Sequence, residues 1–341
     1  MRETPSGLGY RMPAEWEKHE ATWLSWPKDP DTFPPEILPK VEAAYVKMVS
    51  ALSRGEEVRI LVDDKMMEER VRKLLGRVER VRFLALKTAD VWMRDYGPTC
   101  VRGRDVALVK WRFNAWGNKY DDLLPDDEAG ARLAALTGLR TFTPGVVLEG
   151  GSIDVNGMGT VLTTEQCLLN PNRNPSLGRE GIERVLKDNL GVRKVVWLKE
   201  GIEGDDTDGH VDDIARFTGE RAVLVASERD AGDPNHGALS DDMALLRAAT
   251  DERGRDFDVQ EVPMPPRVQA EDGRLPASHL NFYIGNGAVV VPTFGGDSDR
   301  VALSVIGKAF PKRDVAGIDC RALVYGLGTL HCVTQQLPAP A

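Results

Sequence analysis

The feature that most constrains the fold of this chain is a local plan that recurs along it. An apolar segment, a short turn with glycine and a second apolar segment stand together in four places, with the turns RGRD, NGMG, TGE and GNG. Glycine, and asparagine beside it, supplies the positive φ that short hairpin turns need. Each pair is therefore predicted to form a β-hairpin. The pairs span residues 99–113, 152–165, 213–227 and 281–293.

Helical patterns follow the later hairpins, another stands near the start of the chain, and each precedes a short apolar segment. Apolar residues recur at helical spacing in residues 35–52, 177–190, 241–252 and 299–310. The later hairpin turns recur at intervals of roughly 65 residues, which leaves room for about five such units. Five units around an axis would form an α/β fold, a pseudo-symmetric propeller of ββαβ units with its site at the centre. An ordinary α/β sandwich is the alternative.

The chain has 341 residues, 42% of them hydrophobic, which is enough for a sizeable core. No low-complexity tract or Ser/Gly/Pro linker divides it. The nearest candidate for a linker is the polar stretch at residues 265–275, which is short enough to be an ordinary loop. We therefore predict a single domain over residues 1–341.

Composition excludes several classes of protein. The N-terminal segment lacks the apolar core of a signal peptide. The sequence also contains no run of about 18 apolar residues, the length that a membrane-spanning helix needs. The cysteines form no C-x-x-C pair, which favours reduced thiols in a cytoplasmic protein. The net charge of −9 disfavours nucleic acid and anionic membranes as partners and favours small cations. The four cysteines are Cys100, Cys167, Cys320 and Cys332.

Five short segments are rich in residue types that packing alone does not require, and the last of them holds Cys332. A free cysteine is usually a small buried hydrophobe, and the other three cysteines stand in apolar, strand-like runs that fit this interpretation. Cys332 instead lies between His331 and the polar run TQQ, so a catalytic role is reasonable. The segments span residues 91–99, 148–154, 204–213, 282–295 and 326–338.

His210 and Asp212 are two residues apart, which places both side chains on one face of an extended segment. The pair could bind a metal, act as a general acid/base with its orienting carboxylate, or form a surface salt bridge. An EF-hand loop here would need acidic residues at Gly204 and Ala215, and zinc would prefer a second histidine or a cysteine at ligand spacing. A metal is therefore a poor fit.

Asp95 and Glu149 stand where predicted strands give way to Pro or Gly, so either could simply form a turn or a cap. Together with the other polar residues they suit a guanidinium, which carboxylates bind in bidentate fashion. At 4 Å and an effective dielectric of about 20, each charge pair contributes roughly 4 kcal/mol before desolvation. Hydrolysis of the C–N bond needs a strong nucleophile such as a thiolate, and a histidine that protonates the departing ammonia.

Longer motifs at these segments resemble a known family. They are MPAEWEKHEATWLSWP, WMRDYGP, LEGGSIDVNGMGTVLTTEQCLLNPNRNP, DDTDGHVDDIARF and LHCVTQQLP, and they run nearly end to end. The chain is similar to the agmatine deiminases and Porphyromonas-type peptidylarginine deiminases of the guanidine-modifying superfamily. The resemblance implies the pentein fold, a five-bladed propeller of ββαβ units, and no cofactor or metal.

The resemblance also implies roles for five residues. Cys332 would be the nucleophile that forms a thiouronium-type intermediate, and His210 the general acid and base. Asp95 and Asp212 would hold the guanidinium nitrogens, and Glu149 would support the histidine and the substrate.

Two further implications concern the rest of the substrate. Trp92 matches the aromatic residue that lines the substrate channel. Asp206, in an acidic run with Asp205 and Asp208, could receive the distal ammonium of agmatine, or the run could be a solvated turn. The sequences YGLGTLHC and GDDTDGH depart from the common family forms GGGNIHC and NDETNGH, and both loops are expected beside the substrate.

The first functional hypothesis is hydrolysis of agmatine to N-carbamoylputrescine and ammonia, a step of putrescine and polyamine biosynthesis. Deimination of peptidyl-arginine or free arginine is the alternative, and amidinotransfer is a third. An inactive propeller scaffold is the non-enzymatic alternative. No macromolecular partner is expected beyond a homodimer or a larger homo-oligomer.

Overall fold

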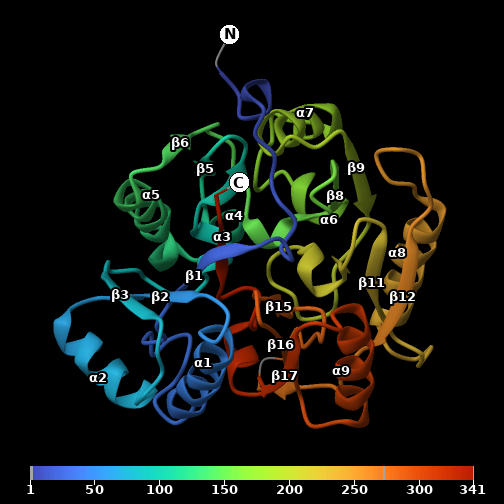
Figure 1. Cartoon of the computed structure of the whole chain (residues 1–341). Coiled ribbons are helices and arrows are strands. Elements are labelled where there is room, and N and C mark those ends of the chain that lie inside the picture. The colour runs from blue at the N-terminus through green and yellow to red at the C-terminus, as the bar shows by residue number, and fades with distance from the viewer. Residues whose placement is uncertain (1–2, 272, 341) are drawn as a thin grey trace.

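The computed structural model describes residues 3–271 and 273–340. Strands and helices alternate along them, so the predicted α/β class is confirmed. The described strands form five sheets of three or four strands and one two-stranded hairpin. Figure 1 shows the five sheets disposed around a common centre, with the longer helices on the outside. This division into small separate sheets is not the arrangement of an α/β sandwich.

Four of the sheets repeat one topology. In each, the first two strands pair antiparallel and the third, reached through a helix or a longer connection, pairs parallel with the second. All four predicted hairpins are therefore confirmed. The sheets are β4 (Thr99–Arg102), β5 (Val106–Val109) and β6 (Arg140–Phe142); β7 (Asp154–Val155), β8 (Thr160–Thr164) and β9 (Lys194–Leu198); β10 (Ala215–Phe217), β11 (Ala222–Ser227) and β12 (Asp258–Pro263); and β15 (Tyr283–Ile284), β16 (Ala288–Thr293) and β17 (Asp314–Asp319).

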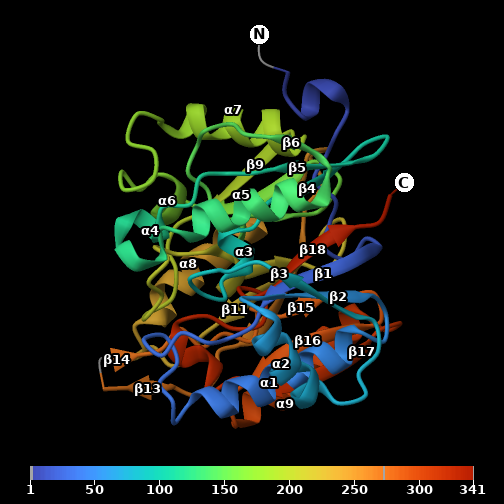
Figure 2. The ribbon, with the colours of Figure 1, turned by 90° about the vertical axis from the view of Figure 1, so that its left-hand side faces the viewer.

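The fifth sheet joins the two ends of the chain. The strand β18 (Gln335–Pro338) pairs antiparallel with β1 (His19–Ser25), which pairs parallel with β2 (Glu57–Val62) and through it with β3 (Val81–Ala85). The C-terminal strand thus takes the place that the first strand of the hairpin has in the other sheets. Figure 2 shows β18 and β1 side by side.

The longer helices agree with the predicted patterns, with shifted ends. The largest shift is at α8 (Asn235–Ala248), which begins after Pro234 and before the predicted pattern, because polar residues and Gly237 mask its first turns. The stretch 265–275, predicted to be an ordinary loop, contains the hairpin of β13 (Gln269–Ala270) and β14 (Gly273–Arg274). The other helices are α1 (Leu38–Leu52), α2 (Lys65–Leu75), α3 (Met93–Tyr96), α4 (Ala115–Asn118), α5 (Asp126–Thr137), α6 (Glu165–Leu168), α7 (Arg179–Leu190) and α9 (Asp297–Ala309).

Three clusters of buried apolar side chains make up the core, and each lies between neighbouring sheets and their helices. None of the described helices is long and apolar enough to cross a membrane.

The repeat places the polar segments at equivalent positions. α3 directly precedes β4, the 3₁₀ turn Gly150–Ser152 precedes β7, and the 3₁₀ turn Val211–Asp213 precedes β10. In the same way Asn281 stands just before β15 and Cys332 just before β18. Because the sheets surround one centre, five segments distant in sequence meet there.

Candidate active site

Cys332 lies at this centre and is only 5% exposed. Its Sγ atom is 3.8 Å from Oδ2 of Asp212 and accepts a hydrogen bond of 3.1 Å from the side-chain amide of Asn281. Burial, together with the charge of Asp212 and of two other carboxylates, raises the pKa of the Cys332 thiol well above its usual value. The resting thiol is therefore protonated, and a cation placed beside it would favour the thiolate.

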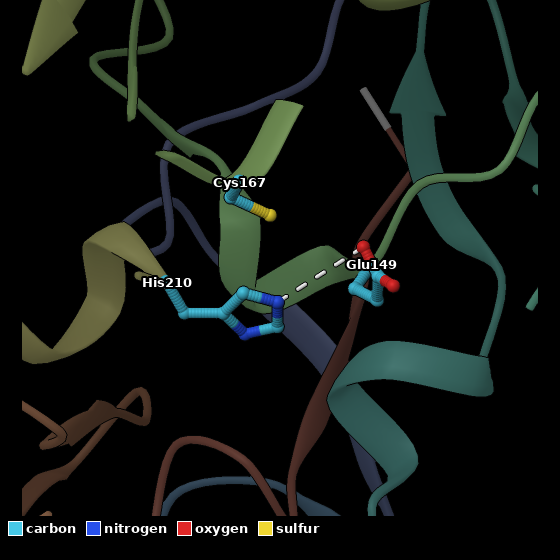
Figure 3. Close-up of side chains that lie close together, drawn as sticks. All are labelled: Glu149, Cys167 and His210. Atoms are coloured by element: carbon cyan, nitrogen blue, oxygen red, sulfur yellow. Dashed lines mark ion pairs between the residues drawn. The ribbon is translucent and has the colours of Figure 1, made fainter. Parts of the chain in front are cut away.

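His210 is buried beside Asp95 and Glu149. Its Nδ1 atom lies 3.8 Å from Oδ1 of Asp95, and its Nε2 atom lies 4.0 Å from Oε2 of Glu149 (Figure 3). Burial alone would lower the pKa of His210, but Asp95 foremost, followed by Cys167 and Asp212, raise it well above its usual value. The imidazole is thus protonated at neutral pH and able to act as a general acid.

Glu149 is oriented by a buried arginine. Nε of Arg173 donates to Oε1 of Glu149 at 2.8 Å, and the same guanidinium binds Asp208 and the carbonyl oxygen of Thr207. This anchor leaves Oε2 of Glu149 directed toward His210.

A cavity of about 580 Å³ leads to these residues, and Cys332 and Asp95 belong to its lining. Two tryptophans form part of its wall. Nε1 of Trp116 donates to Oδ2 of Asp95 at 3.0 Å, and Nε1 of Trp92 donates to Asp90 at 2.7 Å. An apolar wall with carboxylates at its inner end suits a cation on an alkyl chain.

Several buried polar atoms at the centre have no hydrogen-bond partner among the described residues. They are Oε2 of Glu149, Oδ1 of Asp212 and both ring nitrogens of His210. Buried polar atoms in folded proteins are almost always hydrogen-bonded. The two carboxylate oxygens are acceptors and therefore mark the place of a polar ligand that offers several donors, whereas the protonated ring of His210 is itself a donor.

Gly151 keeps this spot open. A Cβ atom on it would lie 2.6 Å from Nδ1 of His210 and 3.0 Å from both Oδ2 of Asp212 and Oδ1 of Asp95. Its backbone N–H also donates to Oδ1 of Asp95 at 2.9 Å. The second glycine of LEGGSID is therefore required because the three ionisable side chains converge on it.

With this geometry in view, comparisons with known proteins place the chain in a family. The family model for Porphyromonas-type peptidyl-arginine deiminase matches residues 11–338. The chain belongs to this family. An agmatine deiminase of Stutzerimonas stutzeri is 38% identical over 100% of this chain and 98% of its own length.

Solved structures agree with this membership. The agmatine deiminase of Enterococcus faecalis superposes with a TM-score of 0.93 at 33% identity, over 100% of this chain and 99% of that one. A C. jejuni agmatine deiminase with substrate bound superposes with a TM-score of 0.88 at 29% identity, over 97% of each chain.

The structure brings all five predicted catalytic residues to one place. The imidazole of His210 and the carboxylate of Asp212 come from the segment before β10, and the other three groups come from segments that precede three other sheets. Trp92 lines the same cavity as Cys332. The residues are Asp95, Glu149, His210, Asp212 and Cys332.

Asp206 lies farther out along the same cavity. Its carboxylate already contacts Nζ of Lys119 at 3.3 Å and the hydroxyl of Tyr120. Asp208 binds Arg173 and Lys119, and Asp205 binds backbone N–H groups of its own loop. The acidic run is therefore tied into the fold rather than a freely solvated turn.

Several contributors to the site were not predicted, among them Arg173, Asn281, Trp116 and Cys167. The local spacing around His210 offers no second soft ligand, but the fold brings Cys167 beside it, so that Glu149, Cys167 and His210 lie within 4.8 Å of one another (Figure 3). A dication there would face the guanidinium of Arg173 and a protonated imidazole. These charges oppose a metal, and the group is better described as the buried support of His210.

Replacing Gly151 by alanine is expected to lower kcat/KM for agmatine by about 100-fold. The reason is that the new methyl group would displace the side chains of His210, Asp95 and Asp212, which converge on this position. Steady-state kinetics and thermal unfolding of the purified variant would measure it. Gly237→Ala is the matched control, since nothing lies within 4 Å of a Cβ atom at that helical position. Retention of nearly full activity by Gly151→Ala would mean that the reaction does not occur where these three side chains converge.

Proposed function

We propose that this chain is an agmatine deiminase, which hydrolyses agmatine to N-carbamoylputrescine and ammonia. The observation that carries the proposal is the convergence of unpartnered acceptors of Glu149 and Asp212, with Asp95, beside a buried thiol. A guanidinium is planar, cationic and rich in N–H donors, so it satisfies these acceptors and neutralises their charge. The names of the full-length relatives support the same substrate.

We also propose that the five sheets are the blades of a five-bladed propeller, the pentein fold, in one catalytic domain. Four sheets share one strand topology, and the fifth completes it with the C-terminal strand. In every blade a polar segment directly precedes the first strand. This repetition explains why the proposed catalytic groups lie at the central axis.

The proposed reaction starts when the substrate cation enters between Asp95 and Asp212. Its charge offsets the carboxylates that disfavour the thiolate of Cys332, so the thiol releases its proton to solvent and the resulting thiolate attacks the central guanidine carbon. His210 donates its proton to the departing ammonia, which leaves a thiouronium cation on Cys332. His210 then removes a proton from water, and the water attacks the same carbon. Collapse of the tetrahedral intermediate passes the hydroxyl proton to the departing sulfur, which releases N-carbamoylputrescine and restores the thiol of Cys332.

The cavity favours an amine at the far end of the substrate over an α-carboxylate. The carboxylates of Asp31, Asp122 and Asp206 line it. The one arginine of its described lining, Arg274, is bound by Asp233 at 2.7 and 2.9 Å and is thereby neutralised. We propose that the distal ammonium of agmatine binds Asp206 and takes over part of its contact with Lys119.

The substrate is tested by ammonia release from agmatine, L-arginine and benzoyl-arginine at equal concentration. We expect kcat/KM for agmatine to exceed that for the two arginine compounds by at least about 100-fold, because an α-carboxylate would be repelled by the acidic side chains that line the cavity. Equal turnover of L-arginine would overturn the choice of substrate. Product formation that depends on added ornithine or glycine would instead identify an amidinotransferase.

A further inference from the structure

A second histidine, His331, lies directly before the nucleophile, between two buried carboxylates. Its Nδ1 atom is 2.6 Å from Oδ2 of Asp212, and its Nε2 atom is 2.9 Å from Oε2 of Glu15. All three side chains are at most 5% exposed. An imidazole donates from both nitrogens only when it carries both protons. The geometry, with one carboxylate oxygen within hydrogen-bond distance of each ring nitrogen, therefore suits an imidazolium between two anions.

Glu15 is itself held as an anion by the surrounding chain. Its Oε1 atom accepts from Nη2 of Arg216 at 3.0 Å and from the backbone N–H of Ile284 at 2.8 Å, and Oε2 accepts from Arg94 at 3.2 Å. Burial would raise the pKa of Glu15, but Arg216, His331 and Arg94 together lower it well below its usual value. A fixed negative charge thus faces the outer nitrogen of His331.

Asp212 differs from the other carboxylates near the thiol. Burial raises the pKa of Asp95 and, far more, that of Asp213. The pKa of Asp212 is instead lowered, because the hydrogen bond and charge of His331, with further help from His210 and Arg216, outweigh its burial. The thiol of Cys332, at 3.8 Å, is the remaining titratable group that contacts it.

The same contact also fixes the direction of the Asp212 carboxylate. Oδ2 is held by His331, and Oδ1 has no partner among the described residues. One oxygen is thus an anchor and the other is free to accept from a ligand.

We propose that Glu15 and His331 are positioning residues that keep Asp212 ionised and aim its free oxygen at the guanidinium of the substrate. The inference rests on the proposed function and assigns a role in it to an N-terminal residue that does not touch the substrate. Glu15 acts through His331, and His331 acts through Asp212.

The test is the pH dependence of kcat/KM for agmatine in wild type and Glu15→Gln. Without the negative charge of Glu15, the protonated form of the His331 ring is less favoured. Asp212 then loses the positive charge beside it, so the pKa of Asp212 rises. Because binding needs ionised Asp212, activity is lost as the pH falls through its pKa, and that acid limb moves to higher pH. We expect a shift of about one pH unit or more, which is about tenfold lower kcat/KM on the acid side.

Glu56→Gln is the matched control, because Glu56 also faces a buried histidine. Its Oε1 atom lies 3.2 Å from Nδ1 of His19, and both side chains are at most 1% exposed, but the pair does not contact Asp212. The control should lose similar stability and keep the wild-type acid limb. Coincident acid limbs for Glu15→Gln and wild type, or equal shifts in both variants, would refute the proposal.

A spectroscopic readout separates this proposal from the proposed function. The chain has five histidines, so nitrogen NMR of the wild type can show whether the His331 ring carries both protons at the pH of the assay. A ring with one bare nitrogen would refute the proposal even if Glu15→Gln does not fold. A wild type inert toward agmatine would refute the function, and the NMR result would still decide the charge of His331.

Discussion

Replacing Cys332 by alanine is expected to lower agmatine turnover by at least about 10⁴-fold while the protein stays folded. Among the described residues that line the cavity leading to Asp95, the thiol of Cys332 is the one strong nucleophile. Without it no covalent intermediate forms, and water must attack an unactivated guanidinium. Ammonia release with excess enzyme would measure the residual rate, and thermal unfolding would confirm the fold.

Cys100→Ala is the control for this variant, because Cys100 is also 5% exposed but lies in β4 as part of the apolar core. It should retain nearly full activity. Rapid acid quenching of the wild type with agmatine should also trap a mass adduct on the peptide that contains Cys332. Substantial turnover by Cys332→Ala would assign the nucleophile elsewhere.

The second large effect is expected for Asp95→Asn, whose kcat/KM for agmatine should fall by about 10³-fold. The substitution keeps the size of the side chain but removes a buried charge that faces both the substrate position and Nδ1 of His210. Losing one partner of a buried charge pair costs about 2–5 kcal/mol. Steady-state kinetics over a range of pH would measure it.

The pH profile of Asp95→Asn distinguishes its two effects. Asp95 is the foremost group that raises the pKa of His210 above its usual value. Without it that pKa falls, so the protonated fraction of His210 is lost at a lower pH and the alkaline limb of activity moves down.

Asp242→Asn is the matched control for Asp95→Asn, since burial also raises the pKa of this carboxyl, to about 7, but in α8 on the outside of the molecule. Its activity should stay close to that of wild type. An unchanged alkaline limb in Asp95→Asn would show that Asp95 does not control the charge of His210.

The unit of the fold could be predicted because it is local. A hairpin such as β7 with β8 depends on the positive φ of Gly157 and Gly159 in its turn and on apolar strands a few residues apart. The candidate site was also recognisable in part, because Cys332 and His210 stand in polar surroundings that packing does not require. The catalytic roles of these residues were inferred from their motifs and from the resemblance to the family.

Other features depended on contacts between distant segments. The pairing of β18 with β1 closes the chain on itself, although neither strand carries a hairpin signal with the other. Glu15 contacts His331, and Arg173 contacts Glu149, through side chains that look like ordinary surface charges in the sequence. Cys167 resembled a core residue until the fold placed it beside His210.

The sequence by itself thus determined the repeating hairpins, the class of fold and the residue types able to carry the chemistry. Only the tertiary structure decided which charges face one another, and with that the protonation of Cys332, His210 and Asp212. The physical reason is that hairpins follow from backbone preferences over a few residues, whereas a pKa follows from burial and from charges within a few ångströms. Those neighbours come from every part of the chain.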